Sequence, residues 1–226
     1  MRLLDGVRTG RTPFELAHGL PLFRWLEDHP RQAAVLNEAN AVKAAGSHRA
    51  IVDIYDFSGL KRLMDLGGGL GALMAEILTS FPHLRGVVAE RPDVARDARK
   101  WLRSRGLADR CDIVGCDFFE AVPGGSDAVL LSHILHDWPD EACLRILENC
   151  RDALEPGSRL LVVEMLLPPG NEPSMSKLLD LEMLVVTGGE ERTEKEYADL
   201  LEASGFKASR VMETRAAVSL IEAVRL

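Results

Sequence analysis

The stretch RLMDLGGGLG, residues 62–71, decides the fold of this chain. An apolar run that only Asp65 interrupts leads into a glycine-rich turn, and a helical pattern follows over residues 70–78. Glycine lacks a Cβ atom, so the backbone can turn tightly there and approach a ligand closely. A strand, a glycine turn and a helix in this order predict a parallel sheet whose ligands bind beyond the carboxyl ends of its strands.

Short apolar runs and helical patterns alternate along the rest of the chain. Strands are predicted at 62–66, 86–89, 112–114, 128–131, 159–163, 208–212 and 217–224, and helices at 70–78, 93–102, 140–154, 176–186 and 193–204. Continuous apolar strands between helices indicate a parallel sheet covered on both faces. We therefore predict a doubly wound α/β fold with a mostly parallel, seven-stranded sheet over residues 59–226. Thr193 and Glu196 form a predicted capping box at the start of the last helix.

Residues 1–58 carry helical patterns and no strand pattern. One short helix is predicted over 21–28, and a longer one over 31–45 that ends at Gly46. Ser47 is then a suitable first residue for another short helix. We predict a helical segment over residues 1–58 that precedes a separate domain over 59–226.

The composition excludes several classes of protein. A chain of 226 residues with 46% hydrophobic and 27% charged residues can build its own core. A net charge of −8 argues against binding to nucleic-acid phosphates. The four cysteines form no C-x-x-C pair, so reduced, buried thiols are expected. Neither a signal peptide nor an apolar run of membrane-spanning length is present, and we expect a cytoplasmic protein without a membrane partner.

Polar residues at the predicted strand ends are the candidate ligand contacts. The glycine spacing is G-x-G-x-G rather than the dinucleotide pattern G-x-G-x-x-G, and the preceding Asp65 suits a ligand with an ammonium group better than a pyrophosphate. Glu90 ends the second strand, where a carboxylate can accept hydrogen bonds from ribose hydroxyls, although an exposed glutamate is the alternative. Asp117 and Phe118 follow the third strand and can hold the edge and face of a purine, although phenylalanine is also a common core residue.

The fourth and fifth strands lead into candidate catalytic residues. His136 follows the fourth strand, and histidine is the natural general base near neutral pH. Asp137 beside it is either part of the site or a helix cap. Glu164 closes an apolar strand, where a charge is costly unless it is paired, so it is either part of the site or a structural ion pair. His133 and His136 together raise the possibility of a metal, but no second His or Cys cluster follows, and no metal site is predicted.

Four motifs together resemble a known family: LMDLGGGLG, HDWPDE, LLVVEMLLP and GGEERT. In this order, over about residues 10–226, they resemble the plant caffeate-type and bacterial polyketide-tailoring O-methyltransferases. The resemblance implies the class I methyltransferase fold, S-adenosyl-L-methionine as cofactor with S-adenosyl-L-homocysteine as its product, and an aromatic or polyketide-like small molecule as acceptor.

The resemblance also implies a role for each matching residue. His136 would be the catalytic base with Asp137 beside it, and Glu164 and Glu191 would flank and orient that histidine. The cofactor contacts would come from the glycine loop and from the strand ends after it: Asp65, Gly67, Gly69, Gly71, Glu90, Asp117, Phe118 and Ser132. Glu90 replaces the aspartate of most relatives, and Ser132 stands where several plant relatives have lysine.

The chain departs from the family pattern at its front. Family members usually begin with a winged-helix-like domain that dimerises and closes over the substrate, and only about 60 residues precede the glycine loop here. We therefore expect a remnant of that region and a weakened homodimer. Two other functions stay open: cofactor-assisted decarboxylation or hydroxylation on the same scaffold, and a non-catalytic cofactor-binding domain. Methylation at nitrogen or carbon also stays open beside methylation at oxygen.

Overall fold

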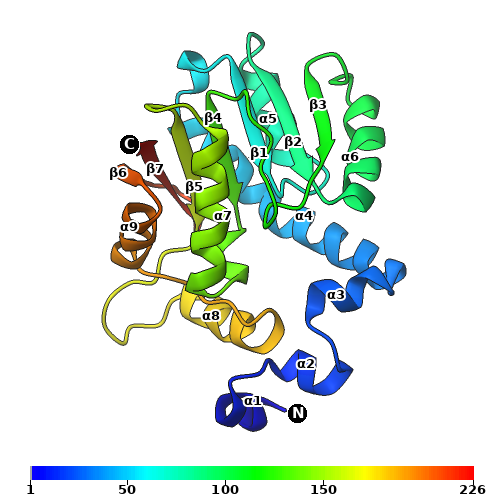
Figure 1. The fold of residues 1–226 in the computed structure, drawn as a ribbon, viewed down its shortest axis with the longest axis vertical. Coiled ribbons are helices and arrows are strands. Elements are labelled where there is room, and N and C mark those ends of the chain that lie inside the picture. The colour runs from blue at the N-terminus through cyan, green and yellow to red at the C-terminus, as the bar shows by residue number, and fades with distance from the viewer. Residues whose placement is uncertain (1) are drawn as a thin grey trace.

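Seven strands form one sheet in the computed structural model, which describes residues 2–226 apart from the side chains of residues 41–45. The strands lie in the order β3-β2-β1-β4-β5-β7-β6 (Figure 1). Their bounds are β1 (Arg62–Leu66), β2 (Arg85–Glu90), β3 (Cys111–Gly115), β4 (Ala128–Ser132), β5 (Arg159–Glu164), β6 (Phe206–Glu213) and β7 (Ser219–Arg225). The strands β1 to β5 are parallel, whereas β7 is antiparallel to both β5 and β6. The predicted mostly parallel, seven-stranded sheet is confirmed.

Helices cover both faces of the sheet, as a doubly wound fold requires. They are α5 (Ala72–Ser80), α6 (Pro92–Ser104), α7 (Asp140–Ala153) and α9 (Glu194–Ala203), whereas α8 (Met175–Val186) lies below the sheet (Figure 1). Neighbouring residues of a strand point to opposite faces. Leu63 accordingly joins a core cluster with residues of α5, whereas Met64 joins the cluster that α7 and α9 cover. The predicted capping box of Thr193 and Glu196 begins α9.

Among the described residues, four α-helices precede the sheet, α1 (Leu3–Thr9), α2 (Pro13–His18), α3 (Leu22–Glu27) and α4 (Pro30–Ile54), followed by the short 3-10 helix η1 (Phe57–Gly59). The helix predicted at 21–28 corresponds to α3. In Figure 1, α1, α2 and α3 lie below the sheet, and α2 packs against α8. No helix of residues 2–226 combines the length and the apolar character that a membrane crossing needs.

The helix break predicted at Gly46 is wrong, because α4 runs through this residue without interruption. A glycine inside a helix costs only about 1 kcal/mol relative to alanine. Ile51 and Val52, one to two turns later, are buried in the core beside α5, and this packing offsets that cost. Ser47 is therefore a buried residue within α4 and begins no helix of its own. The apolar positions predicted at Val42 and Ala45 lie outside the described side chains.

The carboxyl ends of β1, β2, β4 and β5 meet at one edge of the sheet because these strands are parallel. In particular, Ser132 of β4 pairs with Val163 of β5, so the residues that follow these two strands start out as neighbours. Most of the candidate site residues predicted from the sequence lie at or shortly after the ends of these four strands. All four cysteines are free, as predicted, and three of them are buried: Cys111, Cys143 and Cys150.

Candidate active site

The glycine turn after β1 needs glycine for its conformation. Gly67, Gly69 and Gly71 have φ angles of 72°, 57° and 83°, a left-handed region that other residues rarely adopt. A Cβ atom on Gly67 would also lie 2.4 Å from Cδ1 of Ile134, so the turn sits directly against the loop that follows β4.

Asp65 is a buried carboxylate without a hydrogen-bond partner. The residue is 1% exposed, and neither of its carboxylate oxygens has a hydrogen-bond partner among the described residues. Burial, with the nearby charge of Glu90, raises the pKa of Asp65 to about 7. A buried, unpaired carboxylate is unfavourable until a cation or donor reaches it. This carboxylate therefore suits the ammonium group of a ligand, and the predicted contact stays a prediction.

Glu90 ties the end of β2 to the glycine turn. Its Oε2 accepts a hydrogen bond from the backbone N–H of Gly69 at 3.2 Å, and its Oε1 accepts one from the N–H of Arg91 at 2.8 Å. Burial raises the pKa of Glu90. The residue is half-buried beside the turn, and the alternative of a solvent-exposed glutamate does not apply.

The remaining predicted cofactor contacts lie around the same edge. Phe118 is half-buried and approaches the glycine turn, since its Cε1 lies 3.7 Å from where a Cβ of Gly67 would be. Asp117 is exposed, and its Oδ1 accepts a hydrogen bond from the N–H of Phe119 at 2.9 Å. Ser132 is half-buried at the last position of β4.

His136 lies between two buried carboxylates. It belongs to the short 3-10 helix η2 (Leu135–Asp137) and is 7% exposed. Its Nδ1 is 2.7 Å from Oε1 of Glu191 and 3.5 Å from Oε2 of Glu164. Its Nε2 is 4.0 Å from Oδ1 of Asp137. Asp137 lies in η2, and Pro139 is the residue that precedes α7, so Asp137 is not its N-cap.

Electrostatics favour the protonated form of this imidazole. Burial opposes its charge, but the Glu164 carboxylate, the hydrogen bond to Glu191 and the charge of Asp137 outweigh burial and raise the pKa of His136 to about 10. Burial likewise raises the pKa of Glu164, to about 7, although the imidazolium of His136 opposes this shift. A proton on His136 is therefore stabilised strongly by its surroundings.

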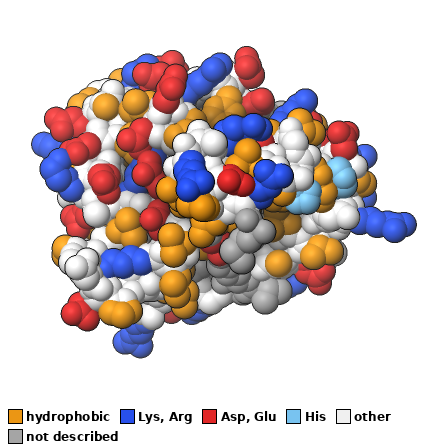
Figure 2. Space-filling model, turned by 90° about the horizontal axis from the view of Figure 1, so that it is seen from below, with side chains coloured by type: hydrophobic (Ala, Val, Ile, Leu, Met, Phe, Trp, Pro, Cys, Tyr) orange, Lys and Arg blue, Asp and Glu red, His pale blue; other side chains and the backbone are white. Residues whose placement is uncertain are grey.

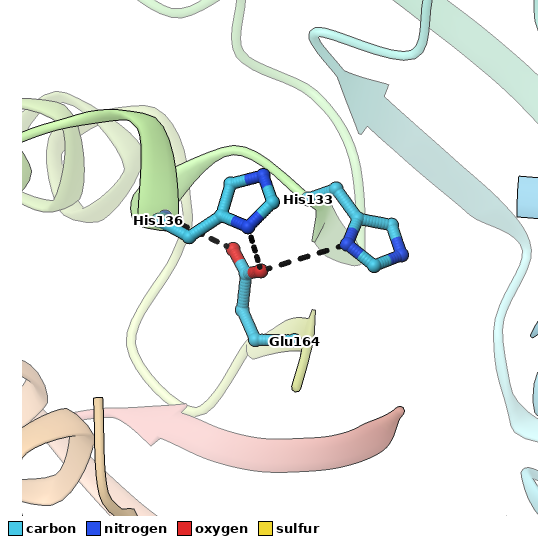
Figure 3. Close-up of side chains that lie close together, drawn as sticks. All are labelled: His133, His136 and Glu164. Carbon is cyan, nitrogen blue, oxygen red and sulfur yellow. Dashed lines mark hydrogen bonds and ion pairs between the residues drawn. The ribbon is translucent and has the colours of Figure 1, made fainter. Parts of the chain in front are cut away.

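Glu164 also fixes the backbone around His136. The residue is fully buried at the end of β5, and its Oε1 accepts hydrogen bonds from three consecutive N–H groups, those of Ile134, Leu135 and His136, at 3.1, 2.9 and 3.4 Å. Its Oε2 accepts no hydrogen bond within the described structure and faces the imidazole (Figure 3). One carboxylate thus shapes the loop with one oxygen and faces the ring of His136 with the other.

Arg192 holds this loop from the other side, and sequence reasoning missed it. The residue is 2% exposed, and its guanidinium donates to the carbonyls of Leu135 and Trp138 at 3.2 and 2.9 Å. It also donates to Oδ1 of Asp140 at 2.9 Å and to Oε1 of Glu190 at 3.0 Å. Arg192 lies between Glu190-Glu191 and the helix cap Thr193, where an arginine is usually exposed. No sequence signal therefore indicated that it is buried.

A further contact was not predicted. Phe23 of α3 stacks on Trp138, with ring centroids 5.3 Å apart, which places the front helices against the loop that carries His136.

A cluster of three side chains could hold a metal ion: the atoms of His133, His136 and Glu164 that can bind a metal all lie within 4.8 Å of one another. The sequence search for a metal site found the two histidines but not the third group, because Glu164 reaches them from a neighbouring strand.

The surface on this side also carries exposed apolar residues. Two on α1 and three on α8 are more than half exposed: Leu4, Val7, Met175, Leu178 and Leu181. Figure 2 views the molecule from below and shows apolar side chains interspersed with charged ones on this face.

A glycine turn after β1, a carboxylate at the end of β2 and a buried histidine after β4 define a doubly wound domain of the kind that binds a nucleoside-containing ligand at its carboxyl edge. The chain belongs to the O-methyltransferase family, since the sequence model for the O-methyltransferase domain matches residues 1–207.

Several curated relatives from bacteria are similar to this chain over most of its length. The chain is 45% identical to the phenazine O-methyltransferase PhzM of Lysobacter antibioticus over 98% of its own length and 65% of that protein. It is 43% identical to the mitomycin biosynthesis 6-O-methyltransferase of Streptomyces lavendulae, over 92% and 60%. It is also 39% identical, over 90% and 55%, to the aclacinomycin 10-hydroxylase RdmB of Streptomyces purpurascens. The chain thus spans 55–65% of the length of these relatives.

Solved structures share the fold over the whole chain. The crystal structure of LaPhzM superposes with a TM-score of 0.97 at 44% identity, and the match covers 100% of this chain and 68% of that one. The O-methyltransferase NcsB1 from neocarzinostatin biosynthesis, solved with S-adenosylmethionine and 2-hydroxy-5-methyl naphthoic acid, matches with a TM-score of 0.92 at 28% identity, over 100% and 67%. The predicted class I methyltransferase fold is confirmed.

Proposed function

We propose that this chain catalyses S-adenosyl-L-methionine-dependent methylation of a hydroxyl on an aromatic or polyketide-like small molecule. The observation that carries the proposal is the buried His136, held between Glu164 and Glu191 at the edge of the sheet that also bears the glycine turn. The names of the similar O-methyltransferases and the naphthoic acid complex of NcsB1 support the same class of acceptor.

The residues around the glycine turn fit the proposed cofactor. The unpartnered carboxylate of Asp65 would take the ammonium group, and Glu90 would take the ribose hydroxyls. Asp117 and Phe118 would contact the adenine side, and Ser132 would make a polar contact with the cofactor. The bound cofactor supplies a methyl group that its sulfonium already activates, with S-adenosyl-L-homocysteine as the product. The chain itself must place the oxygen of the acceptor hydroxyl in line with the bond between the methyl group and sulfur. Such positioning can lower the activation barrier by up to about 7–11 kcal/mol.

His136 acts as the general base in this proposal. When the imidazole is neutral, Nδ1–H donates to Oε1 of Glu191, and Nε2 keeps its lone pair for the proton of the acceptor hydroxyl. Loss of that proton makes the hydroxyl oxygen a better nucleophile, and a positioned base contributes about 10²–10⁴ in rate. The carboxylates of Glu164 and Glu191 stabilise the resulting imidazolium. A phenol has a pKa of about 10, as tyrosine does, so proton transfer from a phenol to His136, whose pKa is raised to about 10, is close to balanced. The neutral imidazole that accepts the proton becomes the main form as the pH approaches 10, so the rate of methyl transfer should rise with pH up to that value.

We propose that methyl transfer needs no metal ion. A metal ion would help the acceptor hydroxyl to lose its proton by lowering the pKa of that hydroxyl. The imidazole of His136 with its two carboxylates can instead remove the proton directly. Activity that persists after removal of metal by EDTA would support this proposal, and loss of activity that added metal restores would contradict it.

The test of the base is His136→Gln beside the exposed control His83→Gln. Transfer of labelled methyl from S-adenosyl-L-methionine is measured on a panel of hydroxylated aromatics, and cofactor affinity is measured on the same samples. We expect the rate of the His136→Gln variant to fall about 10²–10⁴-fold with cofactor affinity unchanged. The control should keep the parent rate. A His136→Gln variant as fast as the parent would refute the role of His136.

A second candidate is cofactor-assisted hydroxylation or decarboxylation without methyl transfer. The similarity to a protein named as a hydroxylase, at 39% identity, is the observation that favours it. The mass of the product separates the two reactions. An added methyl group supports the proposed function, whereas an added oxygen or a lost carboxyl group supports the second candidate.

A further inference from the structure

We infer that His133, His136 and Glu164 form a binding site for a divalent transition-metal ion, best matched by Zn²⁺, whose occupation inhibits the enzyme. Oε2 of Glu164 lies 3.5 Å from Nδ1 of His136 and 3.8 Å from Nδ1 of His133. Ligand atoms of all three residues lie within 4.8 Å of one another. Figure 3 shows both rings on the same side of the Glu164 carboxylate, with dashed lines from both rings to one oxygen.

The backbone brings the two histidines to this carboxylate. The N–H of His133 donates to the carbonyl of Val163 at 3.0 Å, which continues the pairing of β4 with β5 by one residue. His133 then has a φ of 55°, the only positive value among the described non-glycine residues. The chain turns there, and η2 brings His136 over Glu164. The turn thus builds a H-x-x-H pair over a carboxylate that a neighbouring strand supplies.

The carboxylate has one oxygen available for a ligand. Oε1 of Glu164 already accepts three backbone N–H groups. Oε2 is fully buried, accepts no hydrogen bond from the described residues and faces the two rings. A buried acceptor without a hydrogen bond is costly, so a cation at Oε2 would stabilise it.

The chemistry of these three ligands selects the ion. Two imidazole nitrogens and one carboxylate oxygen form a common set for zinc, which leaves a fourth position for water, whereas Mg²⁺ and Ca²⁺ prefer oxygen ligands. Tetrahedral ligands about 2.1 Å from Zn²⁺ lie roughly 3.4 Å from one another. Two of the three ligand separations, 3.5 and 3.8 Å, are within a few tenths of an ångström of this value, and the third, between the two imidazole nitrogens, is at most 4.8 Å. The charges of Glu191 and Asp137 beside His136 add to the attraction for a cation.

Occupation of the site would compete with the base, and this part of the inference rests on the proposed function. A metal ion on Nδ1 of His136 replaces the proton that this nitrogen shares with Glu191. The imidazole would then lose the hydrogen bond that orients it, and its other nitrogen would become a weaker base. Zinc should therefore bind at the site and slow methyl transfer.

The first experiment measures binding itself. The 226-residue chain, without an affinity tag and stripped of metal, is titrated with ZnCl₂ by calorimetry, with MgCl₂ as the comparison. We expect one Zn²⁺ per chain and no Mg²⁺. His133→Asn removes the imidazole, and asparagine tolerates the positive φ of this position. It should weaken zinc binding at least about 10-fold, whereas the exposed control His83→Asn should not change it. No zinc binding, or equal binding by both variants, would overturn the inference.

Two further measurements keep the result interpretable. If His133→Asn does not fold, Co²⁺ is added to the parent chain. The strong visible absorption of four-coordinate Co²⁺, removed by added Zn²⁺, supports the site, and its absence refutes it. Zinc inhibition of methyl transfer, reversed by EDTA and weakened at least about 10-fold by His133→Asn, is then expected. Zinc binding that depends on His133, without methyl transfer to any acceptor, would leave the metal site standing and refute the proposed function instead.

Discussion

Replacement of Arg192 by methionine should destabilise the chain and misplace His136. Methionine fills much of the buried space but removes five hydrogen bonds of the guanidinium. Two of the acceptors are carboxylates of Asp140 and Glu190, which are 66% and 53% exposed, so water can replace the arginine there. The loss therefore comes mainly from backbone carbonyls, those of Leu135, Trp138 and Glu190.

The expected loss of unfolding free energy in Arg192→Met can be estimated from these three carbonyls. Each lost hydrogen bond contributes about 1 kcal/mol net, and a buried acceptor left unpaired costs more. The thiol of Cys143 remains as a weak donor to the carbonyls of Leu135 and Trp138 at 3.2 and 3.4 Å, which limits the loss. We expect the free energy of unfolding to fall by about 2–4 kcal/mol, which for a chain of this size lowers the melting temperature by roughly 5–15 °C.

The assay compares urea unfolding, cofactor affinity and methyl transfer in three variants. Arg24→Met is the matched control, because Arg24 is a 72% exposed arginine that pairs with Glu27. Arg192→Lys keeps the charge but loses the planar fork, and its stability should lie between the parent and Arg192→Met. Cofactor affinity should stay unchanged at a temperature where all variants are folded, while the methyl-transfer rate falls. Stability of Arg192→Met within about 0.5 kcal/mol of the parent would refute this account of the loop.

Three other variants test separate parts of the structure. Burial raises the pKa of Asp65 from its ordinary value of about 4 to about 7, so without ligand the ionisation of Asp65 weakens the fold progressively as pH rises between these two values. Asp65→Asn should therefore raise the melting temperature relative to the parent by more at pH 8 than at pH 5, and equal differences at both pH values would contradict this. Gly189→Ala would place a Cβ 2.1 Å from the carbonyl oxygen of His136 and should cost at least about 1–3 kcal/mol in urea unfolding, so parent-like stability would refute the close approach. Tyr55→Phe loses the 2.6 Å hydrogen bond to Glu222 and should cost about 1.5–3 kcal/mol by the same measurement, while an unchanged midpoint would show that this bond contributes nothing.

The sheet could be predicted because its strands are short, continuous apolar runs between helical patterns. The runs at 62–66 and 159–163 lie within one residue of β1 and β5. The helix break at Gly46 could not be judged from local propensity, because the packing of Ile51 and Val52 against distant residues decides it. Tertiary contacts here outweigh a penalty of about 1 kcal/mol.

The candidate site residues that could be predicted are those at strand ends or in recognised motifs. Glu90 and Glu164 end their strands, Asp65 lies one residue before the end of β1, and His136 follows β4, so parallel topology brings all four to one edge. The buried role of Arg192 depends on the path of two loops, and sequence patterns do not describe such paths. The same holds for the stacking of Phe23 on Trp138, which joins residues more than a hundred positions apart.

The backbone of the loop that carries His136 is held from two sides. Glu164 accepts its N–H groups, and Arg192 donates to its carbonyls. Neither contact specifies which residues occupy the loop, provided that they are not proline where an N–H is needed. Substitutions on this loop can therefore change the acceptor or the reaction while the main-chain path stays the same. For an engineer, Glu164 and Arg192 are the positions to leave fixed, and the side chains of this loop other than His133, His136 and Trp138 are the ones to vary.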